Sequence, residues 1–197
     1  MLTPRFSVRS LAWAGTTSLA IAMASAPASA DALDINLGDN SAQLQYGSAM
    51  GRDSIGKTEF HMGFLYTDQD NLFGDAGILV KNEVGSGLPG VTVGIGIKGL
   101  MATVDSSDVM ALALGGQVRF SPDAASRFGI AGQFYIAPNI VTFGDADRSI
   151  ETGVRLEYEI LPQALAYLGY RKIKFGLEVG PDVVLDEGAH VGVKITF

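Results

Sequence analysis

The stretch VTVGIGIKGLMATV, residues 91–104, decides the fold. Every second residue from Val91 to Ile97 is apolar, and small or polar residues stand between them, which predicts a strand with one apolar face. Its centre, GIGIKG at residues 94–99, also matches the G-x-G-x-x-G pattern of dinucleotide-binding loops. That loop must join a strand to a helix, whereas these glycines lie inside a strand and another strand pattern follows. We therefore expect no nucleotide binding, and we interpret the glycines as the small face of a strand in a narrow, closed sheet.

The same alternation recurs along most of the chain after residue 30. It is found in residues 58–67, 73–81, 109–120, 128–136, 149–160, 164–171 and 189–197, with Gly-, Pro- and Asp-rich turn signals between these segments. The segments are about 9–11 residues long, the length of a tilted strand that crosses a bilayer. No segment has a helical period. The pattern predicts an all-β, closed antiparallel up-and-down transmembrane β-barrel.

The number of strands depends on residues 33–46. They can be read as one strand or as a hairpin about Asp39 and Asn40. As a hairpin, the register places apolar against apolar and polar against polar residues: Leu37 with Ala42, Ile35 with Leu44, Leu33 with Tyr46, Asn36 with Gln43 and Asp34 with Gln45. A barrel with both termini on one side needs an even number of strands. Ten strands are favoured, and eight, with one segment outside the barrel, remain possible.

Residues 1–30 have the features of a secretory signal peptide. Arg5 and Arg9 precede a short apolar run, and Ala28 and Ala30 form an A-x-A site before Asp31. A retained membrane anchor is the weaker reading because small residues and a proline break the apolar run. We predict cleavage after Ala30, which leaves residues 31–197 as the barrel domain.

Composition excludes several classes of function. The chain has 14 Lys and Arg against 21 Asp and Glu, and the predicted signal peptide removes two of the basic residues and none of the acidic ones. Such an acidic chain has no electrostatic basis for binding nucleic acid. It has no cysteine, which rules out disulfides and thiolate metal sites. We expect no cofactor and no metal.

Alternation alone does not say which face points outward, since a soluble barrel hides its apolar face and a membrane barrel exposes it to lipid. The signal peptide and the mixture of charges on the polar face favour a membrane barrel. Enclosed charges must pair, so we predict an ion-pair network that largely fills the lumen. Its members are Glu59, Asp75, Lys81, Lys98, Arg119, Glu151, Arg155, Glu157, Glu159, Arg171, His190 and Lys194.

Two features suggest contacts with the envelope. Val191, Val193 and Ile195 alternate in phase with the terminal Phe197, and this ending resembles the final strand that outer-membrane proteins present to their assembly machinery. Lys172 and Lys174 continue an apolar face. Since lysines facing mid-bilayer lipid would cost about 2–4 kcal/mol each, we expect them at the membrane edge beside phosphates of outer-membrane lipids and lipopolysaccharide.

Residues 135–175, YIAPNIVTFGDADRSIETGVRLEYEILPQALAYLGYRKIKF, and 185–197, LDEGAHVGVKITF, resemble the YfaZ-like family of outer-membrane β-barrel proteins. The resemblance covers the C-terminal half well and the N-terminal half mainly by pattern. It implies a porin-like barrel in the outer membrane of a Gram-negative bacterium, and it brings no catalytic residues.

An enzyme is the less favoured reading. His61 and His190 fall on the charged face, where pairing with an acid is commoner than catalysis, and GSAMG at residues 47–51 does not match the nucleophile elbow. We therefore expect a structural or interaction barrel, or a narrow porin-like channel. The alternatives are an outer-membrane enzyme acting on lipid A or envelope components, and a soluble lipocalin-like periplasmic carrier.

Overall fold

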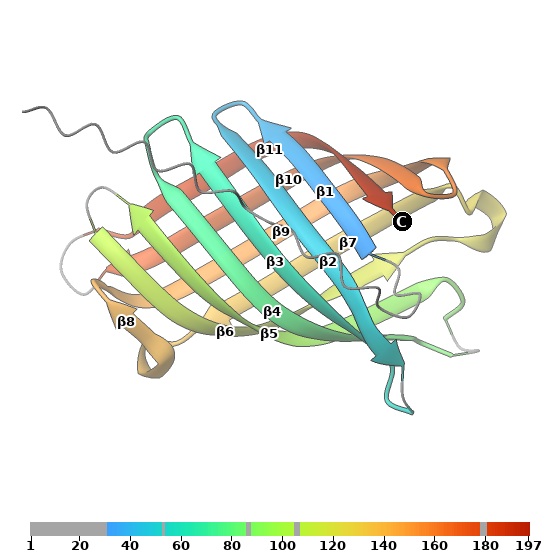
Figure 1. Cartoon of the computed structure of the whole chain (residues 1–197), viewed down its shortest axis with the longest axis horizontal. Coiled ribbons are helices and arrows are strands. Elements are labelled where there is room, and N and C mark those ends of the chain that lie inside the picture. Colours follow the sequence, from blue (N-terminus) through green and yellow to red (C-terminus); the bar gives the residue numbers. More distant parts are fainter. Residues whose placement is uncertain (1–30, 53, 86–87, 105–106, 178–180) are drawn as a thin grey trace, which may run out of the picture.

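The computed structural model describes residues 31–52, 54–85, 88–104, 107–177 and 181–197. The predicted signal peptide lies outside the described residues. The described chain forms a closed antiparallel barrel of ten long strands (Figure 1). The strands are β1 (Asp31–Gly38), β2 (Ser41–Arg52), β3 (Lys57–Thr67), β4 (Leu72–Glu83), β5 (Val91–Val104), β6 (Ser107–Phe120), β7 (Phe128–Ala137), β9 (Ala146–Leu161), β10 (Ala164–Leu177) and β11 (Val183–Thr196).

Each long strand pairs with its neighbours in chain order, and β1 pairs with β11 to close the ring. A short strand, β8 (Thr142–Gly144), lies beside residues 109–111 of β6 without joining the ring. Two 3-10 turns, η1 (Asp123–Ala125) and η2 (Asn139–Val141), flank β7. The ten-strand reading is confirmed.

The hairpin of residues 33–46 has the predicted register. Leu37 pairs with Ala42, Ile35 with Leu44 and Asn36 with Gln43. The brevity of β1 does not prevent closure, because it is hydrogen-bonded on both sides. At its start, the backbone N–H and C=O of Asp31 each bond to Phe197, at 2.9 and 2.8 Å.

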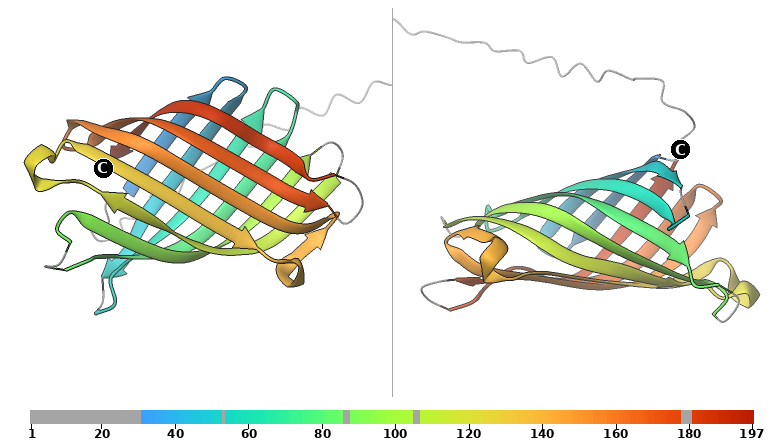
Figure 2. Two further views of the ribbon diagram at one scale, coloured as in Figure 1. Left: turned by 180° about the vertical axis from the view of Figure 1, so that it is seen from behind. Right: turned by 90° about the horizontal axis from the view of Figure 1, so that it is seen from below.

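The long strands from β5 onward, β7 excepted, have more residues than a bilayer crossing requires. β9 has 16 residues, and β5, β6, β10 and β11 have 14 each. Figure 2 shows them as long, tilted ribbons around one interior. We call the end that holds Asp31 and Phe197 the terminal end, and the end that holds β8 and the β1–β2 turn the far end.

The apolar face points outward on every long strand. Ile95 is 67% exposed, Leu156 58% and Phe134 50%, whereas the alternate residues Lys98, Glu157 and Tyr135 are buried. A barrel with an apolar outside and a polar inside is the transmembrane type, so the predicted orientation of the faces is confirmed.

Two inward glycines lie where the neighbouring strand leaves no room for a Cβ atom. A Cβ at Gly96 would overlap the carbonyl oxygen of Ile78, and a Cβ at Gly115 would overlap that of Phe134. The space next to them is occupied: the side chain of Leu79 lies against Gly96 and the ring of Tyr135 against Gly115. The glycines therefore allow close packing of β4 to β7 and leave no open channel along this wall.

Candidate functional site in the barrel lumen

An apolar plug fills the far end of the lumen. Inward residues from eight strands pack together there: Leu65, Phe73, Leu100, Ala102, Val104, Val109, Ala111, Ala113, Tyr135, Ala137, Ala146, Ile173, Phe175 and Leu185. Phe73 and Phe175 are each 1% exposed. The expectation of a lumen filled mainly by charges therefore holds for only part of its length.

The sequence carried a signal for this plug. On β5 the inward residues change from Lys98 to Leu100, Ala102 and Val104 as the strand nears the far end. The inward face of this strand is therefore polar at one end and apolar at the other, and this change in the sequence indicates where the plug lies.

A buried ion pair lies next to the plug, on the side of the terminal end. Lys98 Nζ is 2.5 Å from Glu151 Oε2, and both side chains are about 5% exposed. Gln133 donates to the other carboxylate oxygen at 2.8 Å, and the ammonium lies 4.4 Å from the centre of the Tyr135 ring. Glu151 thus has charge-assisted and neutral donors, as a buried carboxylate requires.

Asp75 is the least satisfied acid of this region. Its Oδ1 is 3.7 Å from His61 Nε2, and its Oδ2 is buried without a hydrogen-bond partner. Within the predicted network, Asp75 is therefore weakly paired, whereas the nearby Glu151 is well paired.

A second cluster centres on Glu157. Arg119 Nε lies 2.5 Å from one oxygen of its carboxylate and Arg155 Nε 2.6 Å from the other. Arg155 also lies over the ring of Tyr167 and 3.7 Å from Asp34, and the Tyr167 hydroxyl donates to Asp34 at 2.5 Å. Two guanidinium groups therefore share one fully buried carboxylate.

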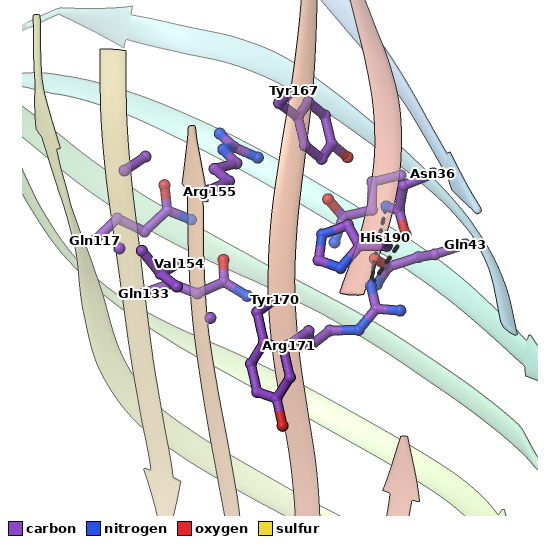
Figure 3. Close-up of a pocket in the computed structure, with 14 residues that line it drawn as sticks. Asn36, Gln43, Gln117, Gln133, Val154, Arg155, Tyr167, Tyr170, Arg171 and His190 are labelled. Carbon is purple, nitrogen blue, oxygen red and sulfur yellow. Dashed lines mark hydrogen bonds between the residues drawn. The ribbon is translucent and has the colours of Figure 1, made fainter. Parts of the chain in front are cut away.

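A third cluster centres on Arg171, which is 4% exposed. Its Nε donates to Asp186 at 2.7 Å, and its Nη1 donates to Asn36 at 3.2 Å and to Gln43. Figure 3 shows Arg171 reaching these amides beside His190, with Arg155 and Tyr167 nearby. The cavity among these residues measures about 40 Å³, which is room for little more than a water molecule.

At the terminal end, Glu59 holds two lysines: Lys81 Nζ is at 2.6 Å and Lys57 Nζ at 3.2 Å. Here the lumen widens into a cavity of about 240 Å³. Lys194 and Glu159 line it, and within the described ranges neither has an oppositely charged group within 4 Å.

The structure thus brings most of the predicted lumen residues into ion pairs and leaves Glu159, Lys194 and His190 outside them. Sequence reasoning missed Asp34, Asp186, Asn36, Gln43, Gln133 and Tyr167. Asp34 was detectable, because the hairpin register had put it on the polar face. For Tyr167, the only related feature of the sequence is Gly192, since any larger residue there would place a Cβ against the tyrosine ring.

Lys172 and Lys174 lie on the outer face of β10, half-exposed and paired with acids. Lys172 Nζ is 2.8 Å from Glu187 and Lys174 Nζ 2.6 Å from Asp182. The hydrogen bond from Lys174, with one from Arg148, holds the pKa of Asp182 below its ordinary value. On the same outer surface, Val191, Val193, Ile195 and Phe197 are 43–66% exposed.

Two classes of feature are missing from the described part of the chain. It contains no helix long and apolar enough to cross a bilayer. Its His, Asp and Glu side chains nowhere gather in a group of three suited to hold a metal ion.

Among solved structures, the chain is similar to the KdgM porin, with 12% identity and a TM-score of 0.45 over 86% of this chain and 99% of the other. The KdgM porin in complex with disordered oligogalacturonate gives 11% identity and a TM-score of 0.46, with the same coverage. Ail, the attachment invasion locus protein of Yersinia pestis, solved with the heparin analogue sucrose octasulfate, gives 10% and 0.24 over 85% of this chain and 99% of that one. No curated protein sequence matches. A sequence model of the family described as YfaZ precursor matches residues 9–197, and the chain belongs to that family.

Proposed function

We propose that this porin-like barrel serves the outer membrane as a structural or interaction protein, with a lumen that passes at most very small solutes. The observation that carries the proposal is the apolar plug. Its members come from opposite walls of the barrel and close the far end, while the ion pairs of Lys98 and Arg171 fill the middle. A ten-stranded ring is only slightly wider than one that side chains fill.

Single-channel recording in planar bilayers tests this proposal. The purified wild-type barrel is expected to give no large, stable conductance. A double variant, Phe73→Ala with Phe175→Ala, removes the two phenyl rings of the plug and serves as the positive control for insertion. Large, stable conductance of the wild type would instead favour a channel for small solutes.

We also propose cleavage after Ala30 and residence of the mature chain in the outer membrane. The exposed apolar belt and the family assignment support this location. Cell fractionation should recover the protein with outer membranes, and mass spectrometry should find Asp31 at its N-terminus. Recovery as a soluble periplasmic protein would favour the lipocalin-like carrier instead.

The proposed partners are lipids and the assembly machinery. Lys172 and Lys174 are proposed to contact phosphates of outer-membrane lipids or lipopolysaccharide, with Glu187 and Asp182 tethering them at the membrane edge. The outward row that ends in Phe197 is proposed as the signal for the assembly machinery. Crosslinking from position 172 to lipopolysaccharide in intact cells tests the first contact, with inward position 98 as the negative control.

The proposed function is not catalytic. Hydrolysis needs a nucleophile or water activated by a nearby base. Among the described residues, neither His61 nor His190 is hydrogen-bonded to a hydroxyl group; His61 faces Asp75, and His190 packs edge-on against the ring of Tyr167. Lipid A analysis of cells that overproduce the barrel should therefore show no new species.

A further inference from the structure

A cavity of about 240 Å³ lies inside the barrel at its terminal end. Its walls come from β4, β5, β6, β7, β9, β10 and β11, and its floor from Pro162 and Gln163 in the β9–β10 turn and from Thr196. Because these residues lie at the terminal end, the cavity faces the periplasm once the barrel is in the outer membrane. The plug separates it from the far end.

Basic side chains outnumber acidic ones around this cavity. The charged residues that line it are Lys81, Arg119, Arg155, Lys194, Glu157 and Glu159. Glu157 already binds two guanidinium groups, and Glu59, which holds Lys81, also holds Lys57. Arg155 also faces Asp34, so the charges of the Glu157 cluster balance. Glu59 is shared between Lys81 and Lys57, which leaves one positive charge uncompensated there.

Of the basic residues that line the cavity, Lys194 is the one that has no acid within 4 Å among the described residues. In the β1–β11 register it lies opposite Asp34, the nearest acid along the sheet. That carboxylate is occupied, since it accepts the Tyr167 hydroxyl and faces Arg155. The half-buried ammonium of Lys194 therefore projects into the cavity close to Lys81 and Arg155, all three of which also line the neighbouring cavity.

We propose that this cavity is a binding site for a small oxyanion, a carboxylate or phosphate group, with Lys194 as its principal contact. Lys81 and the guanidinium groups of Arg119 and Arg155 supply the surrounding positive potential. The volume of about 240 Å³ lies just under the range of drug-sized pockets and equals about eight water molecules. It suits inorganic phosphate or a small organic acid and is too small for a polymer.

Glu159 is expected to weaken the binding of an anion in this cavity. It lines the same cavity, and Leu165 pairs with Glu159 on one side and with Lys194 on the other. Its carboxylate has no cation within 4 Å among the described residues, so it repels an anion bound beside Lys194. Neutralising Glu159 should tighten binding, an effect opposite to that of neutralising Lys194.

Isothermal titration calorimetry on the refolded mature chain in detergent micelles tests the site. Inorganic phosphate and citrate are the probes, and chloride holds the ionic strength constant. Saturable binding is expected for the wild type. Lys194→Gln should weaken it at least about tenfold, because a charge-assisted hydrogen bond is lost, and Glu159→Gln should strengthen it severalfold. Arg148→Gln, which removes an exposed charge at the far end beyond the plug, should leave the affinity unaltered.

Heat-modifiable mobility on gels shows whether each variant is folded. If Lys194→Gln misfolds, the predicted tighter binding by Glu159→Gln still tests the proposal. Absence of saturable binding for both probes would overturn the proposal. So would equal affinities of Lys194→Gln and Arg148→Gln, or weaker binding by Glu159→Gln. Conductance of the wild-type barrel would refute the closed lumen without affecting this site.

Discussion

Removing one partner of the buried Lys98–Glu151 pair should destabilise the barrel strongly. In Lys98→Met, a side chain of similar length replaces the ammonium, and Glu151 keeps only the hydrogen bond from Gln133. The contact of the ammonium with the Tyr135 ring is lost as well. The carboxylate then remains in a site where it is about 6% exposed and has no counter-charge.

The expected loss is about 3–5 kcal/mol of unfolding free energy, the usual cost of breaking a buried pair from one side. The pair of Lys172 and Glu187 provides the scale. It has a similar distance, 2.8 Å, but both side chains are nearly 40% exposed. Lys172→Met should therefore cost far less than Lys98→Met, because exposed ion pairs are screened by water.

A double variant separates the lost charge from the lost packing. Lys98→Met combined with Glu151→Leu removes both charges at once, and apolar replacement of a whole buried pair is often nearly neutral. The double variant should therefore be more stable than Lys98→Met alone.

Urea unfolding of the barrel refolded into lipid vesicles measures these differences. Loss of heat-modifiable mobility on gels gives an independent transition. If Lys98→Met costs no more than Lys172→Met, or if the double variant loses the sum of its two single changes, the argument from burial is wrong.

Four further predictions concern the plug, the Glu157 cluster, the C-terminus and the ion pair of Lys174 with Asp182. Phe175→Ala should cost about 3–5 kcal/mol by opening a cavity in the plug; an unchanged urea midpoint would contradict its burial. Arg155→Ala should lower the melting temperature, and unaltered melting would mean that the residue faces water. Deleting Phe197, or making it charged, should reduce folded barrel without impairing export, and normal abundance would argue against its role in assembly. The hydrogen bond from Lys174 stabilises the ionised form of Asp182 and lowers its pKa, so this contribution to stability is present above the unfolded-state pKa and lost as pH falls through the folded one. An NMR titration should place the Asp182 midpoint below its ordinary value of 3.8 and move it upward in Lys174→Gln; identical midpoints would refute the pairing.

The strands and their outward faces were predictable because one physical rule governs them. Lipid favours apolar side chains along the outside of a barrel, so the alternation from Val91 to Ile97 indicates an outward apolar face once a membrane barrel is inferred from the signal peptide and the mixed charges. The β1–β2 register followed in the same way, since a shift by one residue would have turned Asn36 or Asp34 outward.

The pairing inside the lumen was not predictable, because it joins residues from distant strands. Lys98 on β5 could have met any inward acid, and the ring geometry alone brings it to Glu151 on β9. The acids beside Lys172 and Lys174 were hidden for a related reason: Asp182 and Glu187 meet them only across the β10–β11 hairpin.

The join between β1 and β11 has a consequence for the order of events during folding. Ala32 pairs with Thr196, so the contacts that complete the ring link opposite ends of the described sequence. Such closure loses a large amount of chain entropy before it gains hydrogen bonds, which makes it slow compared with forming neighbouring hairpins. A polypeptide that contains β10 but ends before residue 183 would lack β11 and would keep the unpaired edges of β1 and β10. The barrel therefore cannot close until its last strand has been synthesised. Incomplete chains should keep exposed strand edges and remain substrates for envelope proteases.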